Sequence, residues 1–241
     1  MKEIQIKHED YFLSAVLHEA KIKTAKATII ISHGFRGSKE GGGRARQLAE
    51  SAADNFNVIR YDFTPLGTLT RQKNELNSVL YFVKDNFAGN IILFGRSMGG
   101  CASLLAAAGN KDINGLILWS MPFDTQATFR LSLGDENIEK LKNGMALCLD
   151  DEWGKATLQS EFYTDLISHD IKAALTAVCD IPVLFVHGEL DEIVPVQQAK
   201  QAFSLSNGKT SFSLIKGADH RFINGFEQSR QAVLSWLGNN F

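Results

Sequence analysis

The sequence is poor in features that mark whole classes of protein. It has three cysteines (Cys101, Cys148 and Cys179), an odd number at wide spacings that matches neither a disulfide framework nor a zinc site. No apolar run approaches the roughly 20 residues that a membrane-spanning helix needs. The first ten residues carry scattered charges and no apolar stretch of the kind found in a signal peptide. We therefore expect a reducing, cytoplasmic setting and no membrane span.

Net charge is also small. The formal charge of −2 over 241 residues gives no reason to expect nucleic acid or an anionic membrane as a partner. The glycines at 41–43 have the spacing of neither a phosphate-binding loop nor a dinucleotide fingerprint, so they predict a flexible connection instead. What remains is an ordinary globular composition, 44% hydrophobic and 22% charged, long enough for one domain with a sizeable core.

Apolar runs alternate with helical patterns along most of the chain. The expected strands are 2–7, 11–19, 27–32, 57–63, 90–94, 115–119, 182–187 and 210–215. The expected helices are 44–54, 70–86, 101–108, 171–179, one beginning at Pro195 and a closing one that ends at Leu237. This alternation predicts an α/β fold over 1–241, with a mostly parallel central sheet flanked by helices and an opening antiparallel hairpin.

The alternation is interrupted between residues 121 and 170. That segment holds ten acidic residues against four basic ones, so it carries a charge of about −6. Such a bias is typical of a solvated helical face. Because the segment lies between two core strands, we interpret it as a small cap insertion over the strand ends.

Ser97 stands where a buried strand gives way to a helix. The stretch Ile91–Gly100 places it between Gly95 and Gly99. This pattern is common by chance, but between a strand and a helix it indicates a candidate nucleophile. A tight, slightly strained turn needs neighbours without a Cβ, and the two glycines meet that need. A serine held there is a candidate nucleophile at the N-terminus of a helix, where partial positive charge favours a developing anion.

An activated serine needs a base and an acid that orients the base. On a parallel sheet these groups come from loops at the carboxyl ends of later strands, in the chain order serine, acid, histidine. The loop after strand 182–187 offers Asp191, and the loop after strand 210–215 offers His220. Since His220 is the only histidine after Asp191, the order selects it as the base.

Other side chains compete for these roles. Asp124 follows strand 115–119 and is an alternative acid, although Asp191 fits the order better. Asp219 more naturally shapes its own loop by bonding its backbone. We expect His187 to belong to the turn after its strand and His169 to be a surface residue of the insertion. His8 and His18 come before every relevant element and need no role.

The oxyanion of an acyl-transfer reaction needs two backbone N–H donors. One comes from the residue after the nucleophile, here Met98. The second is expected from the loop after the earlier buried strand 27–32, which makes Phe35 N–H the candidate. His33, in the same loop, is interpreted as a structural turn residue.

Together these stretches resemble the α/β-hydrolase superfamily. The resemblance covers nearly the whole chain in order: His33-Gly34-Phe35, the residues 95–100, the residues 187–195, and Gly217-Ala218-Asp219-His220. The small size and the two short loops look most like cinnamoyl/feruloyl esterase-like carboxylesterases. The chain departs from the family in two places: residues 61–67 lack the usual Gly-His-Gly-x-Ser turn, and Arg96 replaces a histidine or tyrosine before the nucleophile.

The resemblance implies a serine esterase that acts on short-chain or aryl esters through an acyl-enzyme, with Ser97, Asp191 and His220 as the triad and with no metal or organic cofactor. The same triad serves thioesters and other acyl groups, and a non-catalytic ligand-binding protein on this fold is the alternative of another class. We expect a small-molecule ester as the partner, and a homodimer is allowed. Candidates for an apolar acyl or aryl pocket are Trp119, Met121, Phe123, Phe129, Leu131 and Trp153.

Overall fold

The computed structural model describes residues 1–151 and 153–241, and these build a mixed sheet of eight strands. Its spatial order is β1-β2-β4-β3-β5-β6-β9-β10; β1 and β2 run antiparallel to their neighbours and the other strands run parallel. The strand bounds are β1 Lys2–His8, β2 Tyr11–His18, β3 Ala27–Ser32, β4 Asn57–Tyr61, β5 Asn90–Arg96, β6 Ile113–Trp119, β9 Val183–Gly188 and β10 Thr210–Ile215. The α/β prediction is therefore confirmed.

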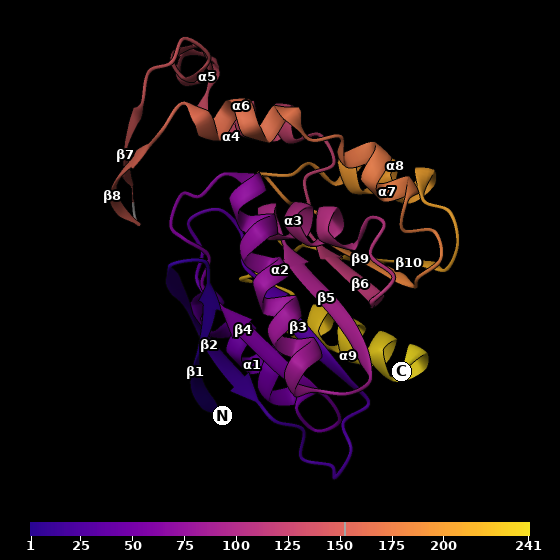
Figure 1. The fold of residues 1–241 in the computed structure, drawn as a ribbon. Coiled ribbons are helices and arrows are strands. Elements are labelled where there is room, and N and C mark those ends of the chain that lie inside the picture. The colour runs from indigo at the N-terminus through magenta and orange to yellow at the C-terminus, as the bar shows by residue number, and fades with distance from the viewer. Residues whose placement is uncertain (152) are drawn as a thin grey trace.

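Helices cover both faces of this sheet (Figure 1). On one face α1 (Arg44–Ala52) and α9 (Phe226–Asn240) pack on an apolar cluster that includes Ile117 and Trp236. On the other face α2 (Leu69–Asn86) and α3 (Met98–Ala107) pack on a cluster that continues into the insertion. The remaining helices of this part are α7 (Ile171–Thr176) and α8 (Val196–Leu205), with a 3-10 turn η1 at Gly41–Gly43. Among the described residues, none of the helices combines the length and apolarity needed to cross a bilayer.

The observed elements follow the expected ones closely. Strands 27–32 and 210–215 have the predicted bounds, and the expected opening hairpin is β1 and β2. The helix after Ser97 begins at Met98 rather than at Cys101. Gly99 and Gly100 are poor helix formers in isolation, and tertiary packing overrides that preference here.

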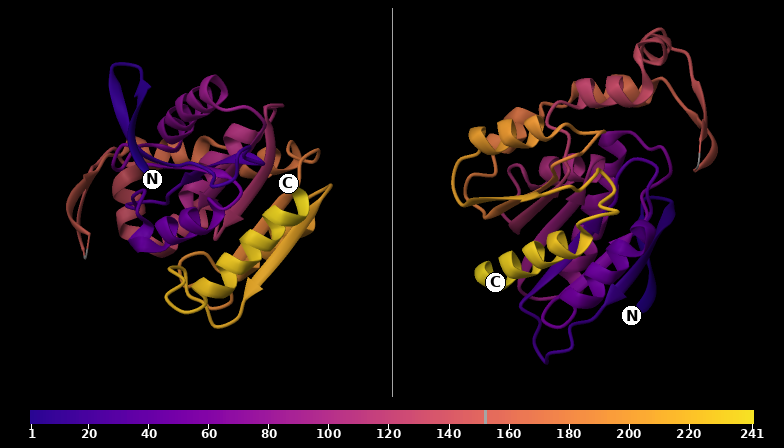
Figure 2. Two further views of the ribbon diagram at one scale, coloured as in Figure 1. Left: turned by 90° about the horizontal axis from the view of Figure 1, so that it is seen from below. Right: turned by 180° about the vertical axis from the view of Figure 1, so that it is seen from behind.

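Residues 121–170 leave the sheet after β6 and lie beyond the carboxyl ends of the strands (Figures 1 and 2). This segment, called the insert below, contains α4 Thr125–Leu133, α5 Asp135–Lys142, the antiparallel hairpin β7 Leu147–Asp151 and β8 Gly154–Leu158, and α6 Glu161–Ser168. Its charge bias predicted a separate segment, whereas the hairpin had no clear signal in the sequence. Glu152, one of its acidic residues, lies outside the described residues.

Gly99 lies close against the end of β3. A Cβ on this residue would lie 2.6 Å from the carbonyl oxygen of Ser32 and would also contact the carbonyl oxygen of His33. Both are backbone atoms at the end of β3, so a clash there cannot be relieved by rotating a side chain.

We therefore expect Gly99→Ala to lower the free energy of unfolding by about 1–3 kcal/mol, the range for an overpacked core. The matched control is Gly238→Ala in α9, where a Cβ would meet no atom within 4 Å. That variant should gain about 0.5–1 kcal/mol because alanine is the better helix former. Urea unfolding measures both, and equal stability of the two variants would contradict the close approach at Gly99.

Candidate active site

Ser97 occupies a sharp turn between β5 and α3. Its backbone angles are φ 51° and ψ −126°, a region that residues with a side chain rarely adopt. A Cβ on Gly95 would lie 2.5 Å from Gly100 Cα and would contact the carbonyl oxygen of Gly99, so only glycine fits before the turn. The Ser97 N–H donates to the carbonyl of Trp119 at 2.8 Å, and the Ser97 carbonyl accepts from Gly100 N–H at 2.7 Å. Neighbouring strand and helix thus hold the strained residue in place.

Asp191 and His220 meet on loops that follow β9 and β10. His220 Nδ1 lies 2.9 Å from both carboxylate oxygens of Asp191. Asp191 also accepts the backbone N–H groups of Ile193, at 3.1 Å, and Val194, at 2.8 Å. With Nδ1–H donated to the carboxylate, a neutral His220 carries its lone pair on Nε2, the nitrogen that a base needs.

The electrostatics of Asp191 favour the ionised form. Burial by itself would raise the pKa of this carboxyl, but the hydrogen bond and charge of His220 and the Val194 N–H outweigh it, so the pKa lies below its usual range. His187 stands beside it, with Nε2 donating to the Val194 carbonyl at 2.8 Å and lying 3.3 Å from Asp191 Oδ2. Burial lowers the pKa of His187, so its ring is neutral where it braces the acid loop. The sequence predicted this histidine in the turn after the strand, whereas it is still part of β9.

Ser97 and His220 are both largely buried at the same edge of the sheet. Within the described part of the chain, Ser97 Oγ makes no hydrogen bond. A loose nucleophile–base contact is common in structures without substrate, and it tightens when a substrate is bound.

The loop after β3 lies directly against Ser97. A Cβ placed on Gly34 would lie 3.0 Å from Ser97 Cβ and 3.6 Å from Ser97 Oγ. The next residue is Phe35, whose backbone N–H donates to no other described residue. Met98 N–H is the first in its helix and lacks a partner four residues back. Neither of these two N–H groups bonds to a described residue, so both are candidate oxyanion donors.

His33 sets the orientation of this loop. Its Nε2 accepts the Phe63 N–H at 3.0 Å, which leaves the proton on Nδ1, and Nδ1 donates to the Gly34 carbonyl at 2.8 Å. Burial lowers the pKa of His33 and keeps the ring neutral. Because a trans peptide points its C=O and N–H in opposite directions, holding the Gly34 carbonyl also fixes the direction of the Phe35 N–H.

The turn at residues 61–67, which lacks the Gly-His-Gly-x-Ser pattern, contacts the loop after β3 at Lys39. Asp62 accepts the backbone N–H of Lys39 and pairs with its ammonium, each at 2.6 Å. Thr64 donates its N–H, at 3.0 Å, and its hydroxyl, at 2.6 Å, to the fully buried carboxylate of Glu75. These bonds anchor the turn to Lys39 and to α2.

The proposed pocket residues lie in three different environments. Phe129 of α4 packs against Phe35, with ring centroids 5.4 Å apart, and both contact Phe162 of α6 at 5.2 Å. Trp119 lies instead in the core on the α9 side of the sheet, 4.8 Å from the ring of Phe222. Met121 is buried against Gly100. Phe129 is thus beside the candidate oxyanion loop, and Trp119 faces away from the insert.

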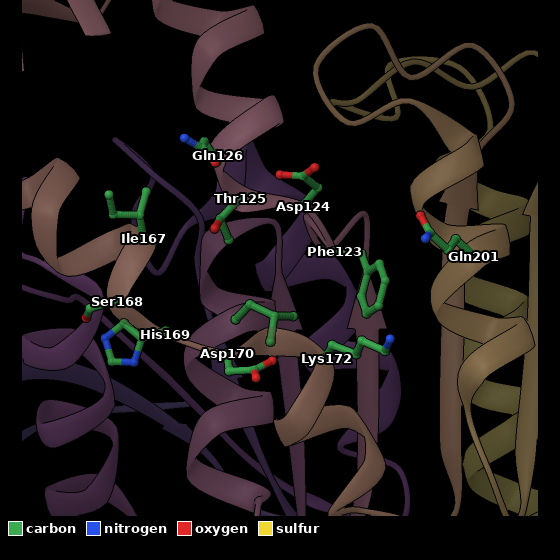
Figure 3. Close-up of a pocket in the computed structure, with 11 residues that line it drawn as sticks. Phe123, Asp124, Thr125, Gln126, Ile167, Ser168, His169, Asp170, Lys172 and Gln201 are labelled. Carbon is green, nitrogen blue, oxygen red and sulfur yellow. The ribbon is translucent and has the colours of Figure 1, made fainter. Parts of the chain in front are cut away.

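The other pocket candidates lie nearer the surface. Phe123 lines a cleft of about 460 Å³ between the start of α4, the α6–α7 connection and α8 (Figure 3). The residues that line this cleft do not include Ser97, Asp191 or His220. Leu131 and Trp153 are each 57% exposed, and Trp153 stands at the turn between β7 and β8.

The competing acids and histidines have structural roles. Asp124 caps α4 by accepting the Ala127 N–H at 2.8 Å. Asp219 accepts the Ile223 N–H at 2.9 Å and so shapes its own loop. His169 Nε2 bonds to the Thr70 hydroxyl at 3.0 Å, which ties the insert to α2.

The tip of the β7–β8 hairpin contacts the loops that carry Phe35 and His220. Arg36, the residue after Phe35, donates to Asp151 Oδ2 at 2.9 Å and to the Gly154 carbonyl at 2.8 Å. Arg221, the residue after His220, lies 5.0 Å from the centre of the Trp153 ring. Arg36 and Arg221 are not among the residues expected from the sequence, although each arginine stands beside a site motif and the insert is acidic.

Comparison with known proteins agrees with this architecture. No family model matches the chain. An uncharacterized protein of Escherichia coli K12, YfhR, is 26% identical over 208 residues, which are 81% of this chain and 63% of YfhR, so the chain spans less than two thirds of this relative. An (R)-3-hydroxydecanoyl-ACP:CoA transacylase of Ectopseudomonas oleovorans is 41% identical over 80 residues, 30% of this chain and 26% of that protein.

Solved structures match over the whole chain. Est1E from Butyrivibrio proteoclasticus with ferulic acid bound superposes with a TM-score of 0.82 at 22% identity, covering 98% of both chains. Other matched structures include α/β hydrolases and esterases. The chain has the α/β-hydrolase fold, as the sequence resemblance implied.

The orientation of the Gly34–Phe35 peptide yields a test. His33→Ala leaves the Gly34 carbonyl with the Gly37 N–H alone, at 3.0 Å, so the Phe35 N–H should turn away from the serine. We expect kcat for an ester substrate to fall about 10- to 100-fold, with little change in KM. This fall should not exceed the one caused by removing an oxyanion donor entirely. His8→Ala, which removes a buried histidine bonded to Ser78, is the control. Equal kcat in both variants would contradict the role of His33.

A second test concerns stability against pH. Burial, with the nearby charge of Arg60, lowers the pKa of His18 to about 4. In the unfolded chain the ring titrates near its ordinary value of about 6.5. The unfolded state therefore binds more protons between these values, and stability falls as the pH drops through that window. Urea midpoints at pH 7 and pH 5 should differ less for His18→Gln than for the natural chain, and an equal loss in both would contradict this assignment.

Proposed function

We propose that this protein is a serine hydrolase that cleaves carboxylic esters through an acyl-enzyme, with short-chain or aryl esters as substrates. The observation that carries the proposal is the buried Asp191–His220 pair, which lies at the same sheet edge as a serine in a strained turn. A serine, a base and an acid in this chain order on an α/β-hydrolase fold are the parts that acyl transfer requires.

In the first half-reaction, Ser97 Oγ attacks the ester carbonyl carbon while its proton passes to His220 Nε2. The carbonyl oxygen becomes an oxyanion, which accepts hydrogen bonds from the N–H groups of Phe35 and Met98. The ionised Asp191 stabilises the imidazolium. Collapse of the intermediate breaks the ester C–O bond, and the alcohol leaves with the proton from His220.

The second half-reaction restores the enzyme. His220 removes a proton from water, the resulting nucleophile attacks the acyl carbon, and the same two N–H groups hold the new oxyanion. Breaking the bond to Ser97 Oγ releases the carboxylic acid, and the serine recovers its proton from His220. Both steps use only water and groups of this chain, so the proposed reaction needs no metal or organic cofactor.

The aromatic cluster of Phe35, Phe129 and Phe162 supports an apolar acyl or aryl substrate beside the oxyanion loop. The structural likeness to Est1E with ferulic acid bound points the same way. We propose the insert as the cap of this site, because its hairpin tip contacts the loops on both sides of the triad. The three unpaired cysteines support the reducing, cytoplasmic setting that we propose with it.

A thioester is the second candidate substrate. The 80-residue likeness to a transacylase that handles acyl thioesters favours it, and a thiol would leave in the same step as the alcohol. Acyl oxygen esters and thioesters of graded length, compared by kcat/KM, decide between the two classes.

The central test removes the nucleophile. Ser97→Ala should lower kcat for p-nitrophenyl acyl esters by about 10⁴-fold or more, because the triad acts as a unit. Ser204→Ala is the control, since its hydroxyl bonds only within α8, to the Gln201 carbonyl at 2.8 Å. A fluorophosphonate should label the natural chain and Ser204→Ala but not Ser97→Ala.

Two outcomes would overturn the proposal. Near-normal turnover by Ser97→Ala would remove Ser97 as the nucleophile. A folded natural chain that is neither labelled nor active on any ester or thioester of the series would favour a ligand-binding protein on this fold.

A further inference from the structure

Arg96, the last residue of β5, bridges two parts of the proposed triad. It directly precedes Ser97, and it is the residue at which the sequence departs from the usual histidine or tyrosine. Its Nη2 donates to the backbone carbonyl of His220 at 3.0 Å. One side chain thus ties the strand that carries the nucleophile to the loop that carries the base.

Glu192 holds the other peptide group of the same histidine. Its Oε2 accepts the backbone N–H of His220 at 3.1 Å. Glu192 directly follows Asp191, just as Arg96 directly precedes Ser97. The main chain of His220 is therefore held on both sides by side chains adjacent in sequence to the other two triad residues.

We propose that Arg96 and Glu192 are positioning residues that fix the backbone of His220 between Ser97 and Asp191. This inference rests on the proposed function, because it matters only if His220 moves protons for Ser97. A triad must be held within about 0.5 Å of its working geometry, and side chains on rigid elements achieve this better than a free loop. Arg96 supplies that rigidity from the central sheet.

The loop after β10 needs such a support. His220 is linked to Asp191 through its ring alone, which leaves the ring free to turn with its backbone. A shift of His220 toward or away from Ser97 would change the proton-transfer distance directly, since no hydrogen bond to a described residue restrains Ser97 Oγ. The Arg96 bond limits this shift.

Arg96 also brings a positive charge close to the base. Burial lowers the pKa of its guanidinium to about 10, which leaves it protonated at neutral pH. The charged and titratable groups around His220 are Asp191 and His187 at the end of β9, Glu192 after them, Asp219 and Arg221 on its own loop, Arg44 at the start of α1, and Arg96. Among these, Arg96, Glu192 and Asp191 bond directly to His220.

Substitutions separate the hydrogen bond of Arg96 to the His220 carbonyl from the charge of its guanidinium. Arg96→Lys keeps the charge and loses the planar fork that reaches the carbonyl, so kcat should fall about 10- to 100-fold with KM within about twofold. The pH at half-maximal kcat/KM should stay unchanged. Arg96→Met loses both the fork and the charge, so kcat should fall at least as far as in Arg96→Lys.

Glu192 allows an independent test of the positioning role, because it is exposed and its variants should fold. Glu192→Ala should lower kcat about tenfold, whereas Glu192→Gln keeps an acceptor oxygen and should retain most of the activity. Arg46→Met and Glu50→Gln, from an exposed ion pair on α1, are the matched controls and should behave as the natural chain.

The experiment measures kcat, KM and pH profiles on a p-nitrophenyl ester, with thermal unfolding and fluorophosphonate labelling of each variant. Natural kcat in Arg96→Lys and in Glu192→Ala overturns the positioning role. A change confined to KM, or a fall in kcat equal for Glu192→Ala and Glu192→Gln, also overturns it. If the natural chain is labelled and active while these variants match it, this inference alone fails; if the natural chain is inert, the proposed function fails first.

Discussion

The close approach of α3 to the ends of β3 and β5 is the constraint on which the site depends. Gly99 fits against the carbonyls of Ser32 and His33 only because it lacks a Cβ. That approach forces Ser97 into a backbone conformation worth about 1–3 kcal/mol of strain, which the surrounding strands must offset. It also brings the loop after β3 against the serine, so one packing contact sets both the turn and its neighbour.

The candidate triad could be predicted from sequence because its signals are local. Glycines around Ser97, an acid after one strand and the last histidine after the next identify the three positions without any knowledge of packing. The face of a strand residue is harder to predict. Trp119 shares its side with Ile117, two positions earlier, and alternation places both toward α9. Which side carries the insert is decided only by the three-dimensional fold.

Long-range contacts explain the rest of what the sequence could not predict. Arg36 and Asp151 are 115 positions apart, and His33 bonds to Phe63, 30 positions later, just beyond the neighbouring strand β4. Hairpin β7–β8 is short and largely exposed, so it has little of the alternating apolar pattern that marks a strand. The acidic bias of the insert is largely a solvated feature, since several of its acids pair with lysines of the same segment at the surface.

Phe35 is part of the loop beside Ser97 and also packs against the insert. Its backbone lies in the loop against the serine, and its ring packs on Phe129 and Phe162 of the insert. A smaller side chain at Phe129 would open space against Phe35, and it would also remove a ring that holds the loop. In the proposed hydrolase, selectivity and turnover would therefore not be independent variables: changes at Phe129 need a compensating residue that again fills the space against Phe35.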